Sequence, residues 1–284
     1  MPIRAKKWLR RMRGGAQSHL IEGDDGHFYV LKAKNNPQHR RILVNEWVAS
    51  VLLSYLQIEA PSPELLEVTT SFVETHPEFC IQLGSRSIPI ETGWHFGSRF
   101  PGDPATLAVF DFLPDVLLHK VANLRDFAAI YALDKWVANA DARQAVFFRA
   151  KLRQPRDHES PQPPREGFVA WMIDHGFAFG GPNWEFTDSP LQSLYHRAAV
   201  YESVTGLDGF EPCLSRIEHF PEDVLDRAYK QIPREWLPDG DDLELERLLN
   251  RLLDRRKRVR HLVEDARRGA RTNPFPRWRL GTGS

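Results

Sequence analysis

Residues 134–150 read DKWVANADARQAVFFRA, and residues 168–176 read FVAWMIDHG. The first stretch passes from helix-compatible residues into a β-prone run, and the second is a β-prone run that ends in Asp174 and a glycine. Between them lies the polar, proline-rich segment LRQPRDHESPQPPRE (residues 152–166). The pattern therefore predicts a hairpin with a long tip, which joins a loop around Asp141 to a turn at Asp174.

These two acidic positions suit phosphoryl-transfer chemistry. A carboxylate on a short loop between a helix and a hairpin can orient an acceptor hydroxyl and take its proton, which makes Asp141 the candidate catalytic residue. Arg143 either orients that loop or neutralises phosphate charge. Asp174, at a strand end before a glycine turn, suits a magnesium ligand. Each motif alone also fits an ordinary turn, where Asn, Asp and Gly are favoured.

A glycine-containing segment, RGGAQS at residues 13–18, stands directly before a predicted strand. Small residues let backbone N–H groups approach phosphate oxygens closely, so this segment is a candidate phosphate-binding loop. It is not a Walker A motif, because no Gly-Lys-Ser/Thr follows, and an ordinary loop is the alternative. The candidate nucleotide-binding residues here are Gly14, Gly15, Ala16, Gln17 and Ser18.

The next segment supplies a candidate lysine–glutamate pair. Two β-prone runs, HLIE and FYVLKA, flank Asp24-Asp25-Gly26 and predict a hairpin that carries Lys32. Glu46 follows fourteen residues later, on a helix predicted over residues 43–56. A strand lysine held by a helix glutamate contacts the α- and β-phosphates of ATP in kinases. A surface lysine is the alternative, and Lys34 is a rival because it lies on the same strand face.

The rest of the chain completes an α+β pattern. Residues 65–74 and 79–84 are β-prone, whereas the Gly- and Pro-rich residues 85–104 are expected to be an irregular crossing segment at a lobe boundary. Apolar spacing predicts helices at 109–118 and 124–137.

Two terminal regions are charged. The C-terminal third is expected to be helical, with an apolar stripe from Leu245 to Val263. The basic stretch from Arg4 to Arg13 is expected to be a solvated terminal segment, with a specific anion or nucleic-acid contact as the alternative.

Composition excludes several classes of protein. Lys plus Arg and Asp plus Glu both number 38, so no net charge draws the 284-residue chain to nucleic acid or to anionic membranes. Two distant cysteines argue against a disulfide framework and a cysteine-based zinc site. Without an apolar run of signal-peptide or membrane-spanning length, a cytoplasmic location is expected.

Taken in order, these segments resemble the HipA-like kinase family, which is related to the serine/threonine kinase toxin HipA and, more distantly, to phosphatidylinositol kinases. The resemblance covers roughly residues 12–201. The blocks that carry it are RGGAQSHLI (13–21), YVLKAKNNPQHRRILVNEW (29–47), HFGSRFPGD (95–103), DKWVANADARQAVFF (134–148) and MIDHGFAFGG (172–181).

The resemblance implies a bilobal, protein-kinase-like α+β fold. Residues 1–100 would form a small antiparallel-sheet N-lobe, residues 101–284 a mostly helical C-lobe, and ATP would lie between them. Lys32 would contact phosphates, Glu46 would hold Lys32, Asp141 would be catalytic and Asp174 would bind Mg²⁺.

The sequence departs from the family at two positions. The metal-binding Asn that usually follows the catalytic aspartate is missing, and Gln144 is the candidate substitute, although its offset from Asp141 is unusual. His175 stands where protein kinases have Phe.

The leading hypothesis is transfer of the ATP γ-phosphate to a hydroxyl, on a protein Ser or Thr. A nucleotide-binding pseudokinase acting through partner contacts is the alternative that the missing Asn favours, and a small-molecule or lipid kinase would share every site residue. An antitoxin-like or regulatory partner is conceivable by analogy with HipA, which acts beside a DNA-binding antitoxin. No direct contact with nucleic acid or membrane is expected.

Overall fold

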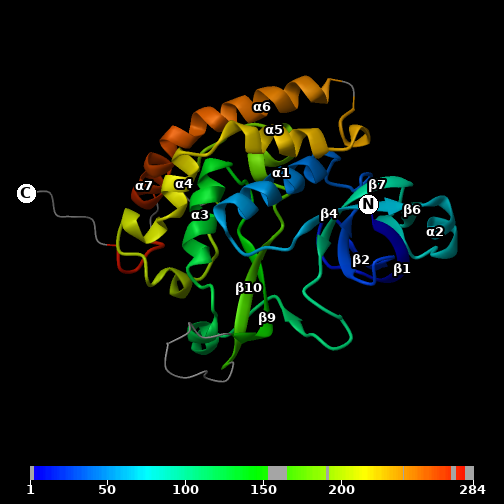
Figure 1. Ribbon diagram of the computed structural model, residues 1–284, viewed down its shortest axis with the longest axis horizontal. Coiled ribbons are helices and arrows are strands. Elements are labelled where there is room, and N and C mark those ends of the chain that lie inside the picture. Colours follow the sequence, from blue (N-terminus) through cyan, green and yellow to red (C-terminus); the bar gives the residue numbers. More distant parts are fainter. Residues whose placement is uncertain (1–2, 153–164, 190–191, 239, 270–272, 279–284) are drawn as a thin grey trace, which may run out of the picture.

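The N-terminal strands close into a five-stranded barrel (Figure 1), in a computed structural model that describes residues 3–152, 165–189, 192–238, 240–269 and 273–278. The strand order is β1-β2-β3-β7-β4, with β1 and β4 paired in parallel and the other neighbours antiparallel. The sequence had predicted an antiparallel sheet, and the parallel pairing of β1 with β4 corrects this prediction. The strands are β1 Ile3–Arg11, β2 His19–Gly23, β3 Phe28–Lys32, β4 Pro63–Val68 and β7 Gly93–Arg99.

Helix α1, Arg41–Leu56, lies between the barrel and the helical remainder of the chain (Figure 1). Most of its side chains are buried around the whole circumference, because it packs against β7 on one side and against α4 and α5 on the other. Leu43, Val48 and Leu52 belong to the larger apolar core. A helix held on all sides is a rigid support for the polar groups that it carries.

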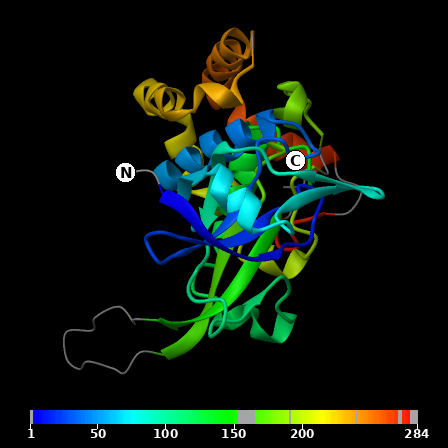
Figure 2. The same ribbon diagram turned by 90° about the vertical axis from the view of Figure 1, so that its right-hand side faces the viewer.

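A second sheet has the order β10-β9-β8 and contains the predicted hairpin. Its strands are β8 Val109–Phe110, β9 Gln144–Leu152 and β10 Arg165–Ile173. Figure 2 shows that the β9–β10 hairpin projects away from α5 and α6. At its base, Gln144 pairs with Ile173, so the start of β9 lies beside the residue that follows β10, Asp174.

The C-terminal helices pack around α3 and bury large aromatic side chains, including Trp136, Tyr131 and Trp236. The α-helices are α2 Thr70–Thr75, α3 Asp126–Trp136, α4 Cys213–Glu218, α5 Glu222–Gln231, α6 Asp241–Arg255 and α7 Val259–Gly269. The 3-10 helices are η1 Asp115–Lys120, η2 Ala178–Asn183, η3 Ala198–Tyr201, η4 Leu207–Phe210, η5 Arg234–Trp236 and η6 Arg256–Arg258. Among these described helices, none has both the length and the apolar character needed to cross a membrane.

The predicted hairpin around Asp24-Asp25-Gly26 is confirmed as β2–β3. The prediction of an irregular segment at residues 85–104 is wrong. That region contains β7, a central barrel strand, and β6 (Arg86–Pro89), which pairs with β5 (Cys80–Leu83). The glycines that argued against a strand have a packing cause. A Cβ at Gly97 would lie 2.4 Å from Leu66 Cδ1, so only glycine lets the two strands close over that leucine.

Three further expectations are corrected. Residues 109–118 are not a helix: β8 ends at Phe110, and Pro114 precedes η1. Residues 65–74 divide into β4 and the short helix α2, whose first turn is capped by the Thr69 hydroxyl. The basic stretch at the N-terminus is strand β1, since Ile3 and Trp8 pack on the barrel core.

Candidate active site

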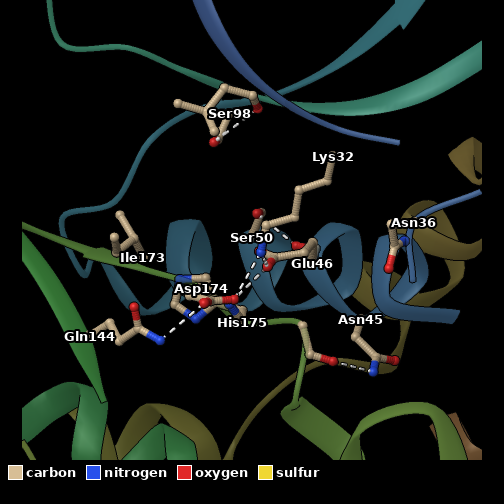
Figure 3. A network of polar contacts seen from close by, with 12 residues as sticks. Lys32, Asn36, Asn45, Glu46, Ser50, Ser98, Gln144, Ile173, Asp174 and His175 are labelled. Carbon is tan, nitrogen blue, oxygen red and sulfur yellow. Dashed lines mark hydrogen bonds and ion pairs between the residues drawn. The ribbon is translucent and has the colours of Figure 1, made fainter. Parts of the chain in front are cut away.

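The barrel end, α1 and the end of β10 bring three charged side chains together (Figure 3). Lys32 Nζ forms an ion pair with Glu46 Oε1 and lies 2.8 Å from Asp174 Oδ1. Lys32 and Glu46 are buried, whereas the Asp174 side chain keeps 33% of its surface exposed. The structure thus joins a strand, a helix and a turn that stand far apart in the sequence.

The charges in this cluster support one another. Burial alone would lower the pKa of Lys32, but the neighbouring carboxylates of Glu46 and Asp174 raise it above its ordinary value. The Lys32 ammonium, in turn, holds the pKa of Asp174 below the usual range. At neutral pH the site therefore holds a fixed cation beside a partly exposed anion.

The rival lysine has a different partner. Lys34 Nζ forms an ion pair with Glu235 of η5, and the Lys34 backbone N–H donates to His95 Nδ1 at 3.0 Å. Lys34 therefore ties the barrel to the C-terminal helices, and the geometry selects Lys32 as the lysine beside Glu46.

The turn after Asp174 packs against α1. Asp174 has a φ of 60°, and the His175 N–H donates to Glu46 Oε1 at 3.0 Å. His175 points inward: Arg143 Nη1 lies 3.2 Å from its Nδ1, and its Nε2 lies 3.2 Å from the Met172 carbonyl. Because a guanidinium only donates, Nδ1 must accept and Nε2–H must donate, so the ring is neutral. Burial, together with the charge of Arg143, lowers the pKa of His175 to about 3.

Asp141 lies on the loop between α3 and β9 and is half-buried. The loop is tied locally, since the Asp141 N–H donates to Asn139 Oδ1 at 3.2 Å and the Ala142 N–H donates to Asp141 Oδ1 at 2.7 Å. The Ser193 N–H donates to the Asp141 carbonyl at 3.2 Å. The carboxylate is thus held on a fixed loop that leads directly into the strand facing Asp174.

Gln144, the first residue of β9, reaches the candidate metal ligand. Its Nε2 donates to Asp174 Oδ2 at 3.0 Å (Figure 3). The structure therefore places the side-chain amide beside the carboxylate, despite its unusual offset from Asp141.

Arg143 is buried, and its guanidinium is engaged by the protein itself. Nε donates to Asp134 Oδ2 at 2.8 Å, Nη2 contacts the other oxygen of Asp134, and Nη1 donates to the Ile173 carbonyl at 2.8 Å. These contacts correspond to the loop-orienting alternative, because they link α3 to the end of β10. The catalytic role of Arg143 stays a prediction.

The glycine-containing segment forms the turn between β1 and β2. Because His19 pairs with Leu31, this turn lies at the barrel end where Lys32 is found. Gly14 has a φ of 119°, which a side chain would strain. Gln17 does not extend from the turn as a free side chain: its Nε2 donates to the Gln82 carbonyl at 2.7 Å, and its Oε1 accepts from the Gln82 N–H at 2.7 Å.

The other members of the turn differ in exposure, since Gly15 is exposed. Ala16 and Ser18 are buried, and a Cβ at Gly15 would lie 2.8 Å from the Gln38 side-chain nitrogen. The turn is thus a supported loop, and Gly14, where a Cβ would meet no atom within 4 Å, is the part of its backbone that is free of neighbouring side chains.

Sequence reasoning gave no role to Asp134, Asn139 or Asn45. Asp134 accepts from Arg143 and from Asn139 Nδ2, at 3.1 Å for the latter. Asn45 is fully buried next to Glu46. The available signal for Asp134 and Asn45 was a polar residue inside an apolar helix, which requires hydrogen-bond partners, whereas Asn139 lies on the loop after α3.

Comparison with solved structures gives the class of fold. The chain superposes on a Golgi casein kinase with Mn/ADP bound at a TM-score of 0.51, with 12% identity over 93% of this chain and 73% of that one. A second structure of the Golgi casein kinase gives a TM-score of 0.50 at 12% identity, covering 93% and 72% of the two chains. The Helicobacter pylori proinflammatory kinase CtkA scores 0.45 at 12% identity, covering 91% and 94%. The fold, with its strands and helices, is protein-kinase-like.

Residues 6–150 match the HipA-like kinases, so the chain belongs to the HipA-like kinase family. The match ends within β9 and includes the turn at 13–18, Lys32, Glu46 and the Asp141 loop. Comparison with curated proteins gives no match.

Proposed function

We propose that this HipA-like kinase transfers the γ-phosphate of ATP to a hydroxyl acceptor, a Ser or Thr side chain of a protein. In this proposal the fold is bilobal, and the nucleotide lies between residues 1–100 and residues 101–284. The observation that carries it is the contact of Lys32 with both Glu46 and Asp174. A buried lysine fixed between a helix glutamate and a strand-end aspartate is the arrangement that phosphate binding in kinases requires.

Asp174 and Gln144 fit a magnesium ion by their chemistry. Mg²⁺ prefers oxygen ligands, and a partly exposed carboxylate lies beside a side-chain amide that carries an oxygen as well as a nitrogen. Rotation of the amide by half a turn would present that oxygen in place of the nitrogen. Bound there, the ion would neutralise phosphate charge. The missing Asn was the reason to consider a pseudokinase. The contact of Gln144 with Asp174 weakens that reason, because the Gln144 amide could take the place of the Asn.

The residues of the chain divide the remaining tasks. The Lys32 ammonium would donate hydrogen bonds to phosphate oxygens, while Glu46 keeps it in place. The backbone at Gly14 and Gly15 would approach the phosphates from the barrel side. Asp141 would orient the acceptor hydroxyl and take its proton, on a loop that Asp134 and Arg143 hold.

The test is incubation of the purified protein with ATP radiolabelled at the γ-phosphate and magnesium, beside Asp141→Asn. We expect label transfer or phosphate release in the wild type and a loss of about 100-fold or more in the variant, with nucleotide binding retained. Equal turnover in both proteins would remove Asp141 from the catalytic role. A wild type that neither binds ATP nor turns it over would refute the proposal.

A further inference from the structure

Asn45 is a polar side chain with no exposed surface in the second turn of helix α1, and both ends of its amide are hydrogen-bonded. Its Nδ2 lies 2.7 Å from the Gly176 carbonyl, 3.1 Å from that of Ala178 and 3.0 Å from that of Gly181. Its Oδ1 accepts from Trp184 Nε1 at 2.7 Å. One side chain thus contacts four residues of the segment that follows Asp174.

That segment does not form one continuous helix. Phe179, Gly180, Gly181 and Trp184 have φ values of 60°, 71°, 69° and 56°, so the 3-10 helix η2 is interrupted by a kink and ends at Trp184. Buried carbonyls without partners are costly. The Asn45 amide supplies donors where the irregular chain turns its carbonyls inward.

One face of α1 forms hydrogen bonds with the backbone on both sides of the Gly176 Cα. Ile42, Asn45 and Glu46 stand three and four residues apart and therefore share that face. Glu46 Oε1 accepts the N–H of His175 at 3.0 Å, while Asn45 donates to the Gly176 carbonyl. A Cβ at Gly176 would lie 2.5 Å from Ile42 Cγ2, which shows how closely the backbone approaches the helix.

A second contact from α1 holds the far end of the segment. Arg41 Nη1 donates to the Pro182 carbonyl at 3.0 Å, and its guanidinium lies 4.1 Å from the centre of the Trp184 ring. Arg41 is itself fixed by Asp241 at the start of α6. The segment is therefore bound to α1 along its length, with Asn45 at the middle.

We propose that Asn45 is a positioning residue: by fixing residues 176–184 on α1, it sets the place of the Asp174 carboxylate beside Lys32 and Gln144. The proposal rests on the proposed function in one respect, that Asp174 is the magnesium ligand. Because Asn45 and Glu46 are neighbours on one helix, the lysine and the metal ligand are then placed by a single rigid support. Residues that orient a metal ligand commonly change metal affinity about 10-fold to 100-fold when replaced.

The main variant is Asn45→Leu, which keeps a side chain of similar shape and removes every hydrogen bond. Trp184→Phe is the milder second variant, because it removes the N–H that orients the Asn45 amide while it keeps an aromatic ring beside Arg41. Asn123→Ala is the matched control. Asn123 also bonds to backbone, with Nδ2 2.7 Å from the Ala170 carbonyl and Oδ1 2.9 Å from the Ala170 N–H, but it does not touch residues 174–184.

Two measurements are made on each full-length variant. Calorimetry gives the affinity for ADP with and without magnesium, and the ratio of the two is the metal-dependent gain. Amide hydrogen exchange gives the protection of residues 175–184. For Asn45→Leu we expect the gain to fall by about tenfold or more, metal-free binding to persist and exchange in 175–184 to rise. Trp184→Phe should lower the metal-dependent gain and raise the exchange of residues 175–184 by smaller amounts. Asn123→Ala should leave the gain and the exchange unchanged.

The outcomes separate the two claims. A metal-dependent gain in Asn45→Leu within about twofold of the wild type, or an equal loss in Asn123→Ala, overturns the positioning role. If Asn45→Leu does not fold, Trp184→Phe decides by the same readouts. If the wild type shows no metal-dependent gain, the proposed function fails, and hydrogen exchange alone decides the placement of the segment. Unchanged exchange in 175–184 then refutes it.

Discussion

Replacement of Lys32 by methionine should reveal how strongly the buried ion pair depends on both partners. The Glu46 side chain is only 4% exposed, so the variant would leave a carboxylate inside the protein without its cation. Removal of one partner of a buried pair costs about 3–5 kcal/mol. The His175 N–H still donates to Glu46, and Asp174 is solvated in part, so we expect the low end of that range, about 3 kcal/mol at neutral pH.

The cost should depend on pH in a defined direction. Without Lys32, burial and the charge of Asp174 both raise the pKa of Glu46 above its unfolded value. A carboxyl group with a raised folded pKa is tolerated while it is protonated, and stability is lost as the pH rises through that pKa. The difference between variant and wild type should therefore be small near about pH 5 and grow toward about pH 7.5.

Urea unfolding at several pH values measures this difference. Lys7→Met is the control, because Lys7 is an exposed lysine on another barrel strand. The double variant Lys32→Met with Glu46→Gln should regain most of the lost stability, since no buried charge remains. A free energy of unfolding for Lys32→Met within about 0.5 kcal/mol of the wild type at neutral pH, as expected for Lys7→Met, would contradict the dependence of the buried pair on both partners.

Two further predictions concern the metal site and the barrel. Gln144→Ala should raise the magnesium concentration required for half-maximal nucleotide binding by about tenfold, and an unchanged requirement in a magnesium titration would exclude the amide as a ligand. For His95, burial lowers the pKa to about 3, and the neutral ring accepts the Lys34 N–H and bonds to the Glu91 carbonyl. Its folded pKa lies below the unfolded value, so its contribution is present above about pH 6.5 and should be reduced by about 2 kcal/mol at pH 5. His95→Gln should flatten that acid slope in urea unfolding, and an identical slope in both proteins would show that other groups cause it.

What the sequence predicted well was local. The β2–β3 hairpin and the helix that carries Glu46 follow from turn residues and from apolar spacing within one segment. Strand β7 was missed because its glycines suggest a loop when read alone. Gly97 is required by Leu66 of β4, and that contact exists only once the barrel has closed.

The same limit applies to the candidate site. The pairing of Lys32 with Glu46 was predictable because a strand and the next helix bring them together. The hydrogen bond from Asn45 to Gly176 joins residues that are 131 apart in the sequence, and it depends on how the turn after Asp174 packs against α1. No periodicity within either segment contains that information, although an asparagine beside Glu46 in an apolar helix was a visible anomaly.

Gln144 shows why position along the chain was a poor guide to the proposed metal site. Counted from Asp141, it stands at the wrong offset for the missing Asn. Counted across the hairpin, it faces Ile173, and its side chain therefore reaches the residue that follows. Because side chains alternate along a strand, a slip of one residue in the β9–β10 register would turn the amide away from Asp174. The fit of the proposed site to magnesium thus depends on strand pairing, and substitutions that shift the register should affect it as strongly as replacement of Gln144 itself.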